Sequence, residues 1–364
     1  MKTLLALLLL IPSLSWGLTF KGGEVVNKST NSNDDSNKTA ANNKKYEQKY
    51  LDPNYVFKSD EKVIWPNGFG DWGKTFKVHD RIHPNSWALR FDDEFLRVED
   101  YSLRFEKREK DCHPDDCNRT SANYIGRSEI SIKEITNSTY GELGNKWYTW
   151  SFYIPEESQL PGDDGNYSLG FVIMGQFKTP TNHQYLTREY LGIPGIVNGP
   201  SSEEKCPELS LNFQLKQSGL VVDRKGTKFC KSGKSFYVNL IKPDDLKGKW
   251  HDIIINANWT DSEDEGFIML WVNGEMKLLH EGKTISKLLK IDNTIHGPTL
   301  RIGVYSQRWN GTSIVYYNNI KRSDTCKNLK VNLLNLSCEG LRSEIEKKKN
   351  ESNSLLDELD FAIQ

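Results

Sequence analysis

The sequence predicts an all-β protein, a β-jelly-roll sandwich of two antiparallel sheets followed by a short C-terminal helix. Between residues 55 and 322, apolar and polar side chains alternate with a period of two in one segment after another, which is typical of half-buried strands. Helical spacing is apparent only near the C-terminus. Aromatic residues make up 11% of the chain, enough to fill a large core. Many strands with few helices favour a sandwich or jelly roll.

The clearest strands lie in the second half of the chain. In residues 209–216 the side chains of one face are apolar and those of the other are polar. Residues 251–259 place Ile253, Ile255, Ala257 and Trp259 on a single face. Residues 266–272 then lead into Asn273-Gly274, the dipeptide that most strongly indicates a two-residue hairpin.

The N-terminus predicts export. Lys2 precedes an apolar run from Leu4 to Ile11, and Pro12 and the small residues around Trp16 follow it. This order is typical of a cleaved secretory signal, here residues 1–17. The run is too short for a membrane span, which takes about 20 apolar residues. We therefore expect a secreted or periplasmic protein without membrane contact after cleavage.

Composition divides the rest of the chain into three parts. Residues 18–54 are rich in Asn, Lys and Ser and predict a disordered linker, because they offer little apolar surface to bury. Residues 55–325 form the expected β domain. Residues 326–364 are the expected helical tail, in which apolar residues recur at roughly helical spacing at Ile345, Leu355, Leu356, Leu359 and Ile363.

The six cysteines favour structural disulfides in an oxidising compartment. They occur as the couples Cys112 and Cys117, Cys206 and Cys230, and Cys326 and Cys338. Pairing within each couple is a hypothesis from proximity, because six cysteines allow fifteen connectivities. No couple has the spacing of a zinc site. We expect no metal and no cofactor, although the turn at Asp163-Asp164-Gly165 leaves a structural calcium ion open as the less favoured alternative.

The formal net charge of −1 gives the chain no general attraction to nucleic acid or membranes. Any binding of a polyanion must come from a local group of cations.

Three predicted strands carry polar residues inside apolar segments. In residues 127–132, Ile130 and Ile132 point to the core, so Arg127 and Glu129 point away from it.

The other two strands follow the same rule. In residues 171–178 we place Phe171, Ile173 and Phe177 on the core face and Gln176 and Lys178 on the opposite face. In residues 300–307 the core residues are Leu300, Ile302 and Val304, and the outward residues are Arg301, Tyr305 and Gln307. If the strands share one sheet, these polar side chains share a face, with Gln214 and Lys216 of residues 209–216 as further candidates for that face.

Such a face suits β-elimination in a uronic acid chain. The sugar carboxylate must be neutralised so that the enolate charge developing at C5 is tolerated, and Arg, Gln and Lys can do this. A base then takes the C5 proton and an acid protonates the leaving oxygen. A tyrosine serves in either role if nearby cations lower its pKa. Arg127 or Lys178 suits that task better than Arg301, which lies about 13 Å from Tyr305 along the strand and would bind a neighbouring sugar.

The chain resembles the jelly-roll polysaccharide lyases, which include heparin lyase I, glucuronan lyase and, more distantly, the alginate lyases. Six segments between residues 60 and 322 carry the resemblance: Gly126-Arg-Ser-Glu-Ile, Gly175-Gln-Phe-Lys, Gly248-Lys-Trp-His-Asp, Trp271-Val-Asn-Gly, Leu300-Arg-Ile-Gly-Val-Tyr and Val315-Tyr-Tyr-Asn-Asn-Ile-Lys. The resemblance implies a concanavalin-like jelly roll, with Arg127 and Gln176 neutralising the substrate carboxylate and Tyr305 as catalytic acid, base or both.

The chain departs from its relatives at two positions. Many have His where this chain has Lys178, and many have Lys where it has Arg301. His183 is the candidate to replace the missing imidazole, whereas we interpret His251 as structural. Arg308 and Trp309 follow the strand of Tyr305 and are candidates to line a sugar subsite, with Glu129, Gln214 and Lys216 as further substrate-binding candidates.

The sequence thus predicts a secreted, monomeric lyase acting on an acidic polysaccharide. The alternative is a lectin-like protein that binds such a chain on the same fold without cleaving it. A glycoside hydrolase would need two opposed carboxylates, and Glu129 is the single obvious one on these faces. A purely structural surface protein would tolerate the loss of the Tyr305 hydroxyl.

Overall fold

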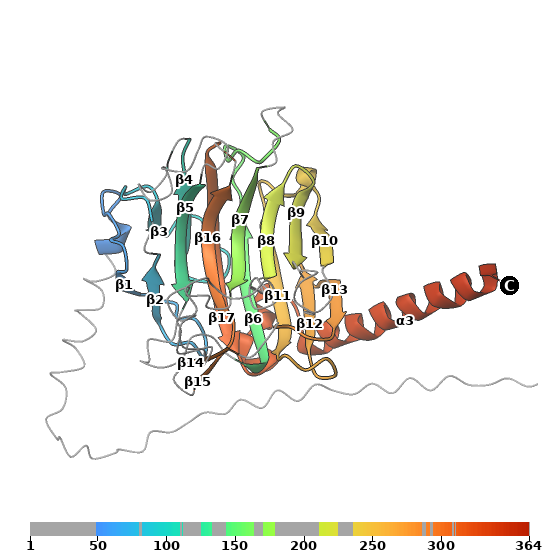
Figure 1. Ribbon diagram of the computed structural model, residues 1–364. Coiled ribbons are helices and arrows are strands. Elements are labelled where there is room, and N and C mark those ends of the chain that lie inside the picture. The colour runs from blue at the N-terminus through green and yellow to red at the C-terminus, as the bar shows by residue number, and fades with distance from the viewer. Residues whose placement is uncertain are drawn as a thin grey trace, which may run out of the picture. The chain divides into compact units, whose positions relative to one another are not determined.

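The strands form two antiparallel sheets packed face to face, as the alternation predicts (Figure 1). This computed structural model describes residues 49–79, 82–109, 111, 125–132, 143–163, 170–178, 211–224, 236–285, 289–291, 294–307, 309 and 311–363. The predicted signal, residues 18–48 of the predicted linker and four of the six cysteines lie outside these residues.

The eight-stranded sheet has the order β1-β2-β5-β16-β7-β8-β9-β10. Its strands are β1 (Lys62–Ile64), β2 (Thr75–Val78), β5 (Ile125–Ile132), β16 (Thr299–Gln307), β7 (Phe171–Lys178), β8 (Leu211–Lys216), β9 (Gly219–Arg224) and β10 (Phe236–Ile241). All of its neighbours pair antiparallel. The three strands that carry the predicted site, β5, β16 and β7, are therefore adjacent (Figure 1).

The seven-stranded sheet has the order β13-β12-β11-β6-β17-β4-β3. Its strands are β13 (Glu275–Glu281), β12 (Phe267–Val272), β11 (Trp250–Trp259), β6 (Gly144–Tyr153), β17 (Ser313–Ser323), β4 (Ser102–Lys107) and β3 (Leu89–Asp92). A separate pair joins β14 (Leu289–Ile291) to β15 (Thr294–His296), and the short 3-10 helix η2 spans Pro243–Asp245.

The core between the sheets is made by the predicted apolar faces. Ile253, Ile255 and Ala257 of β11 are fully buried in it, as are Leu300 and Ile302 of β16. The hairpin between β12 and β13 turns at Asn273 and Gly274, which both have positive φ angles of 52° and 87°. Two positive φ values are what a type I′ turn requires, and this explains the Asn-Gly signal. The core also includes Tyr50, ahead of the domain start expected at residue 55.

The C-terminal segment packs against the outer face of the seven-stranded sheet. It comprises two 3-10 helices, η3 (Cys326–Leu329) and η4 (Val331–Leu334), and helix α3 (Cys338–Ile363). A second apolar cluster joins it to the sheet and contains the stacked rings of Trp147 and Trp271, together with Cys326, Leu329, Val331 and Leu341. The predicted Cys326–Cys338 disulfide is confirmed. The predicted C-terminal helix is confirmed as well, and its 26 residues begin at the second cysteine of that bond.

Candidate active site

Arg127 and Tyr305 face each other across two adjacent strands on the outer face of the eight-stranded sheet. Ile130 and Ile132 of β5 are buried in the core, so Arg127 and Glu129 point away from it, as predicted. Tyr305 in β16 pairs directly with Arg127 in β5. The guanidinium carbon of Arg127 lies 4.4 Å from the centre of the Tyr305 ring, within the range of a cation–π contact.

Glu129 holds Gln176 and Arg127 together. The Gln176 amide Nε2 donates to Glu129 Oε1 at 2.9 Å, and Arg127 Nη1 lies 3.7 Å from Glu129 Oε2. Strand β16 lies between Glu129 in β5 and Gln176 in β7. Its residue opposite Glu129 is Gly303, so no side chain separates the carboxylate from the amide. Glu129 is 1% exposed. A carboxylate this buried orients the amide and the guanidinium more than it contacts a substrate, which changes the substrate-binding role expected for it.

His79 belongs to the same cluster, although the sequence analysis did not single it out. Its Nε2 lies 3.4 Å from Arg127 Nη1 and 3.2 Å from Arg301 Nη1. Guanidinium groups only donate, so Nε2 accepts and the ring proton sits on Nδ1. The His79 backbone N–H donates to the Glu129 carbonyl at 3.0 Å, which continues the pairing of β2 with β5. Arg301 is thereby joined to the centre of the site.

Two atoms of this cluster are buried without a hydrogen bond to any described residue. They are Glu129 Oε2 and Arg301 Nε. Buried polar atoms in folded proteins nearly always have a partner, so an unpartnered pair in a single cluster requires an explanation. Glu129 Oε2 lies 3.7 Å from Arg127 Nη1, beyond hydrogen-bond length, and a ligand that accepts from the guanidinium would satisfy Arg301 Nε, as the carboxylate of a sugar acid could.

A β-bulge in β7 corrects one prediction. Ile173 pairs with Gln214 of β8 and Gly175 pairs with Phe213, so Met174 is the extra residue. Val172 and Met174 therefore pack in the core, and Ile173 lies outside it beside Tyr305. Phe171, two residues before Ile173, is half-buried and shares that outer face. Strict alternation had placed Phe171 and Ile173 in the core, which is wrong, whereas Phe177 and Gln176 point as predicted.

The strand pairings arrange the outer face in two parallel rows that run across the strands. One row contains Lys77, Ser131, Arg301, Gln176, Asn212, Asp223 and Tyr237. The other contains Arg127, Tyr305, Ile173, Gln214, Val221 and Asn239. At roughly 4.8 Å per strand, the first row spans about 29 Å.

Three predicted residues lie away from the centre of the cluster. Lys178 pairs with Thr299 at the far end of β16 from Tyr305, so Arg127 is the cation beside the tyrosine. Gln214 is 2% exposed and its amide donates to Asp223 Oδ1 at 2.8 Å. The Lys216 ammonium lies 4.7 Å from the ring centre of Tyr237 near the edge of the sheet.

Trp309 is not a surface residue. It is 4% exposed and packs in the core, so the prediction that its ring lines a sugar subsite is wrong. His183 and Arg308 lie outside the described residues, as does the Gln307 side chain. Asp163 accepts hydrogen bonds from the Leu160 N–H and the Lys247 ammonium in a turn, and Asp164 and Gly165 are outside the described residues. No cluster of potential metal ligands occurs in the described part of the chain.

Lys107 anchors the segment that follows β16. It is 1% exposed, and its ammonium donates to the carbonyls of Trp309 and Gly311 at 3.2 and 3.0 Å. Burial lowers the pKa of Lys107 from 10.5 to about 8, against the opposing effect of Asp111. Between about pH 8 and 10.5 the unfolded chain therefore binds more protons at this site than the folded one, so the stability contribution of Lys107 rises with pH in that window.

We expect the Lys107→Met variant to show a flatter dependence of stability on pH than the parent protein. Relative to the variant, the parent should gain on the order of 3 kcal/mol in unfolding free energy from pH 8 to 10.5. Urea unfolding of both proteins at pH 7.5, 9 and 10.5 measures the difference. Parallel curves for the two proteins would show that Lys107 does not titrate in this window.

Comparison with known proteins adds a family match to this geometry. A family model described as polysaccharide lyase matches residues 67–321, which include every residue of the cluster. No curated protein matches the sequence.

Several solved structures are similar to this chain at low identity. An endo-β-1,4-glucuronan lyase from the fungus Trichoderma reesei is 14% identical, with 74% of this chain and 96% of that chain covered and a TM-score of 0.45. A variant of alginate lyase A1-II′ is 15% identical, covering 66% and 84% of the two chains with a TM-score of 0.38. Alginate lyase Aly36B is 12% identical, covering 72% and 96% with a TM-score of 0.33.

Proposed function

Because the chain belongs to the polysaccharide lyase family, we propose that it cleaves a uronic-acid-containing polysaccharide by β-elimination on the outer face of its eight-stranded sheet. One observation carries the proposal: Tyr305 lies in register with Arg127, beside the buried Gln176–Glu129 pair and the buried Arg301 Nε, which has no hydrogen bond to a described residue. The family supplies the reaction class, and this cluster supplies groups that suit each step.

The first step is neutralisation of the sugar carboxylate. Arg301 has a buried Nε without a described partner, and Gln176 has a second amide proton besides the one that it donates to Glu129. Arg127 provides a second guanidinium. Hydrogen bonds from these groups to the carboxylate stabilise the enolate that forms when C5 loses its proton.

The second step moves two protons and breaks one bond. A base removes the C5 proton, and the electron pair of that C–H bond forms the C4=C5 double bond. The C4–O4 bond breaks, and an acid gives a proton to O4 as it leaves. Tyr305 is the proposed acid, with its ring held against the Arg127 guanidinium. His79 is the proposed base, because its Nε2 is an acceptor that lies beside the two guanidinium groups expected to bind the substrate carboxylate.

This assignment differs from the earlier hypothesis about the imidazole. The sequence pointed to His183 as the substitute for the histidine that many relatives have at the position of Lys178. His79 already contacts both arginines of the cluster, whereas Lys178 lies at the other end of its strand.

The charge of the cluster favours an acidic substrate over a neutral one. Arg127 and Arg301 provide two positive charges around the single negative charge of Glu129. A hydrolase would need a second carboxylate about 5 to 10 Å from the first. The buried carboxylate of the two rows is Asp223 in β9, which lies four strands from Glu129 and so about 19 Å away.

Export of the protein is part of the proposal. The N-terminal pattern of a secretory signal supports it, and the Cys326–Cys338 disulfide agrees with an oxidising compartment. Among the described helices, none has the length and apolar character needed to cross a bilayer.

Incubation of the mature protein with a panel of uronic acid polymers tests the proposed function. We expect the ultraviolet absorbance of unsaturated chain ends to grow with at least one of glucuronan, alginate and heparin-like chains. Binding to a polymer without any such absorbance would favour the lectin-like alternative. New reducing ends without absorbance would favour a hydrolase.

A further inference from the structure

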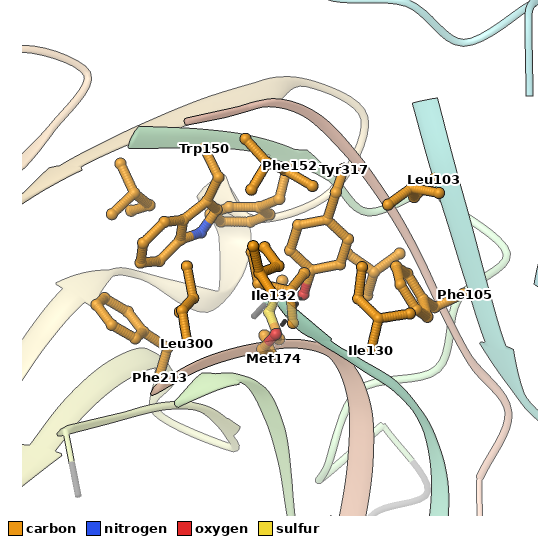
Figure 2. Close-up of a cluster of buried hydrophobic side chains, with 14 of the residues drawn as sticks. Leu103, Phe105, Ile130, Ile132, Trp150, Phe152, Met174, Phe213, Leu300 and Tyr317 are labelled. Carbon is orange, nitrogen blue, oxygen red and sulfur yellow. Dashed lines mark hydrogen bonds between the residues drawn. The ribbon is translucent and has the colours of Figure 1, made fainter. Parts of the chain in front are cut away.

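Tyr317 of the seven-stranded sheet contacts two strands of the candidate site, β7 and β16, on their core-facing side. It lies in β17 and is fully buried. Its side chain extends across the core toward the eight-stranded sheet (Figure 2). The hydroxyl donates to the Met174 carbonyl oxygen at 2.7 Å and lies 3.1 Å from the Gly303 carbonyl oxygen. Met174 belongs to β7 and Gly303 to β16, so one hydroxyl contacts the backbone of both strands.

Both carbonyls lie where the pairing of these strands is irregular. Ile302 pairs with Gly175 and Tyr305 pairs with Ile173, so two residues of β16 oppose the single residue Met174. A bulge interrupts the regular ladder and leaves backbone groups to find other partners. Gly303 has a φ of 146°, and a Cβ there would overlap the Ser128 carbonyl, so the backbone at this point is accessible to glycine alone.

The irregular segment lies between the two groups of the proposed chemistry. Gln176 follows it in β7, and Tyr305 follows it in β16. A slip of one residue in this pairing would turn one of the two side chains toward the core. The geometry that brings Gln176 to Glu129 and Tyr305 to Arg127 therefore depends on how this bulge is held.

The Tyr317 hydroxyl is suited to hold the bulge between β7 and β16 in place. Burial raises the pKa of Tyr317 well above 10, and the nearby Glu129 carboxylate raises it further, so the hydroxyl stays a donor across the working range of pH. Its ring packs edge-on against Phe105, with ring centres 5.5 Å apart, and is enclosed by core side chains from both sheets (Figure 2). Replacement by Phe would keep this packing and remove the donor alone.

We propose that Tyr317 is a positioning residue for the lyase reaction, which fixes the bulge between β7 and β16 and thereby the placement of Gln176 relative to Tyr305. The inference rests on the proposed function of these two residues. Tyr317 lies on the core side of the sheet and touches no substrate.

The Tyr317→Phe variant tests this, with Tyr148→Phe as its matched control. Tyr148 is also a buried core tyrosine, 1% exposed, and its hydroxyl accepts from Trp259 Nε1 at 2.7 Å. Both variants lose the hydrogen bonds of one buried hydroxyl, so both should lower the melting temperature by a few degrees. In the Tyr317→Phe variant alone, kcat should fall on the order of tenfold to a hundredfold while KM changes little.

Steady-state kinetics on the polymer identified by the panel, with thermal unfolding of all three proteins, separates the outcomes. Equal kcat losses in the two variants, or none in either, would overturn the positioning role, as would a Tyr317→Phe protein that fails to fold while Tyr148→Phe folds. If the parent protein forms no unsaturated product on any polymer, the proposed function fails first, and so does the positioning role that rests on it.

Discussion

The Tyr305→Phe variant is expected to lose about 10²- to 10⁴-fold in kcat, the range that a positioned acid or base contributes. Phenylalanine keeps the ring that faces the Arg127 guanidinium and removes the hydroxyl proposed to transfer the proton. Polymer binding should therefore change little, and KM with it. Because Tyr305 is half-buried on the outer face, the unfolding free energy should change by less than about 1 kcal/mol.

Tyr153→Phe is the matched control for this change. Tyr153 is another half-buried tyrosine, located on the outer face of the opposite sheet in β6. Its kcat should equal that of the parent protein, measured by the growth of unsaturated ends. A Tyr305→Phe protein that keeps most of the parent activity would remove Tyr305 from the mechanism, and His79 would then have to supply both proton transfers.

Gln176→Met is expected to lower kcat/KM by about 10²- to 10³-fold, the usual effect of removing one donor from an oxyanion site. Methionine has nearly the same size and cannot donate to the sugar carboxylate. The change also takes the amide donor away from Glu129 Oε1, which leaves that buried carboxylate with less support. We expect a loss of stability of roughly 1–3 kcal/mol, which urea unfolding would measure.

Gln214→Met separates the chemical effect from the structural one. Gln214 makes the same kind of bond, a buried amide donating to the Asp223 carboxylate, one strand further along the sheet. The two variants should lose similar stability. The loss in kcat/KM should be much smaller for Gln214, and similar losses for both would mean that Gln176 acts through the fold instead of on the substrate.

The fold could be predicted because the period of two is a local property of each strand. Ile253, Ile255 and Ala257 reveal their shared face without any knowledge of the partner strands, and Asn273-Gly274 reveals its turn in the same way. Polar residues set inside apolar segments then pointed to β5, β16 and β7 as carriers of the site, and the family resemblance agreed with that choice. Their adjacency in one sheet follows from pairing between residues far apart in the chain, which no local pattern contains.

The candidate site could be predicted in part. The alternation of side chains placed Arg127, Glu129, Arg301 and Tyr305 correctly on the outer face. It failed at Ile173, because the extra residue Met174 in the bulge reverses the direction of the side chains that precede it in β7. Trp309 was misplaced because a position just past a strand says nothing about burial. His79 could have been found by extending the alternation of Phe76 and Val78, both buried, by one residue beyond β2.

The packing of the C-terminal segment on the seven-stranded sheet, with its disulfide, determines how the protein would respond to a force applied at its C-terminus. A force applied to the end of α3 reaches the fold at Leu341 and Cys338, and the disulfide passes it to Cys326, three residues after β17. Strand β17 is hydrogen-bonded between β6 and β4, so the tension is taken up as shear along an interior strand. Strands β5, β16 and β7 belong to the other sheet. A protein tethered through its tail to a surface would thus bear that load mainly on the sheet opposite the proposed active site.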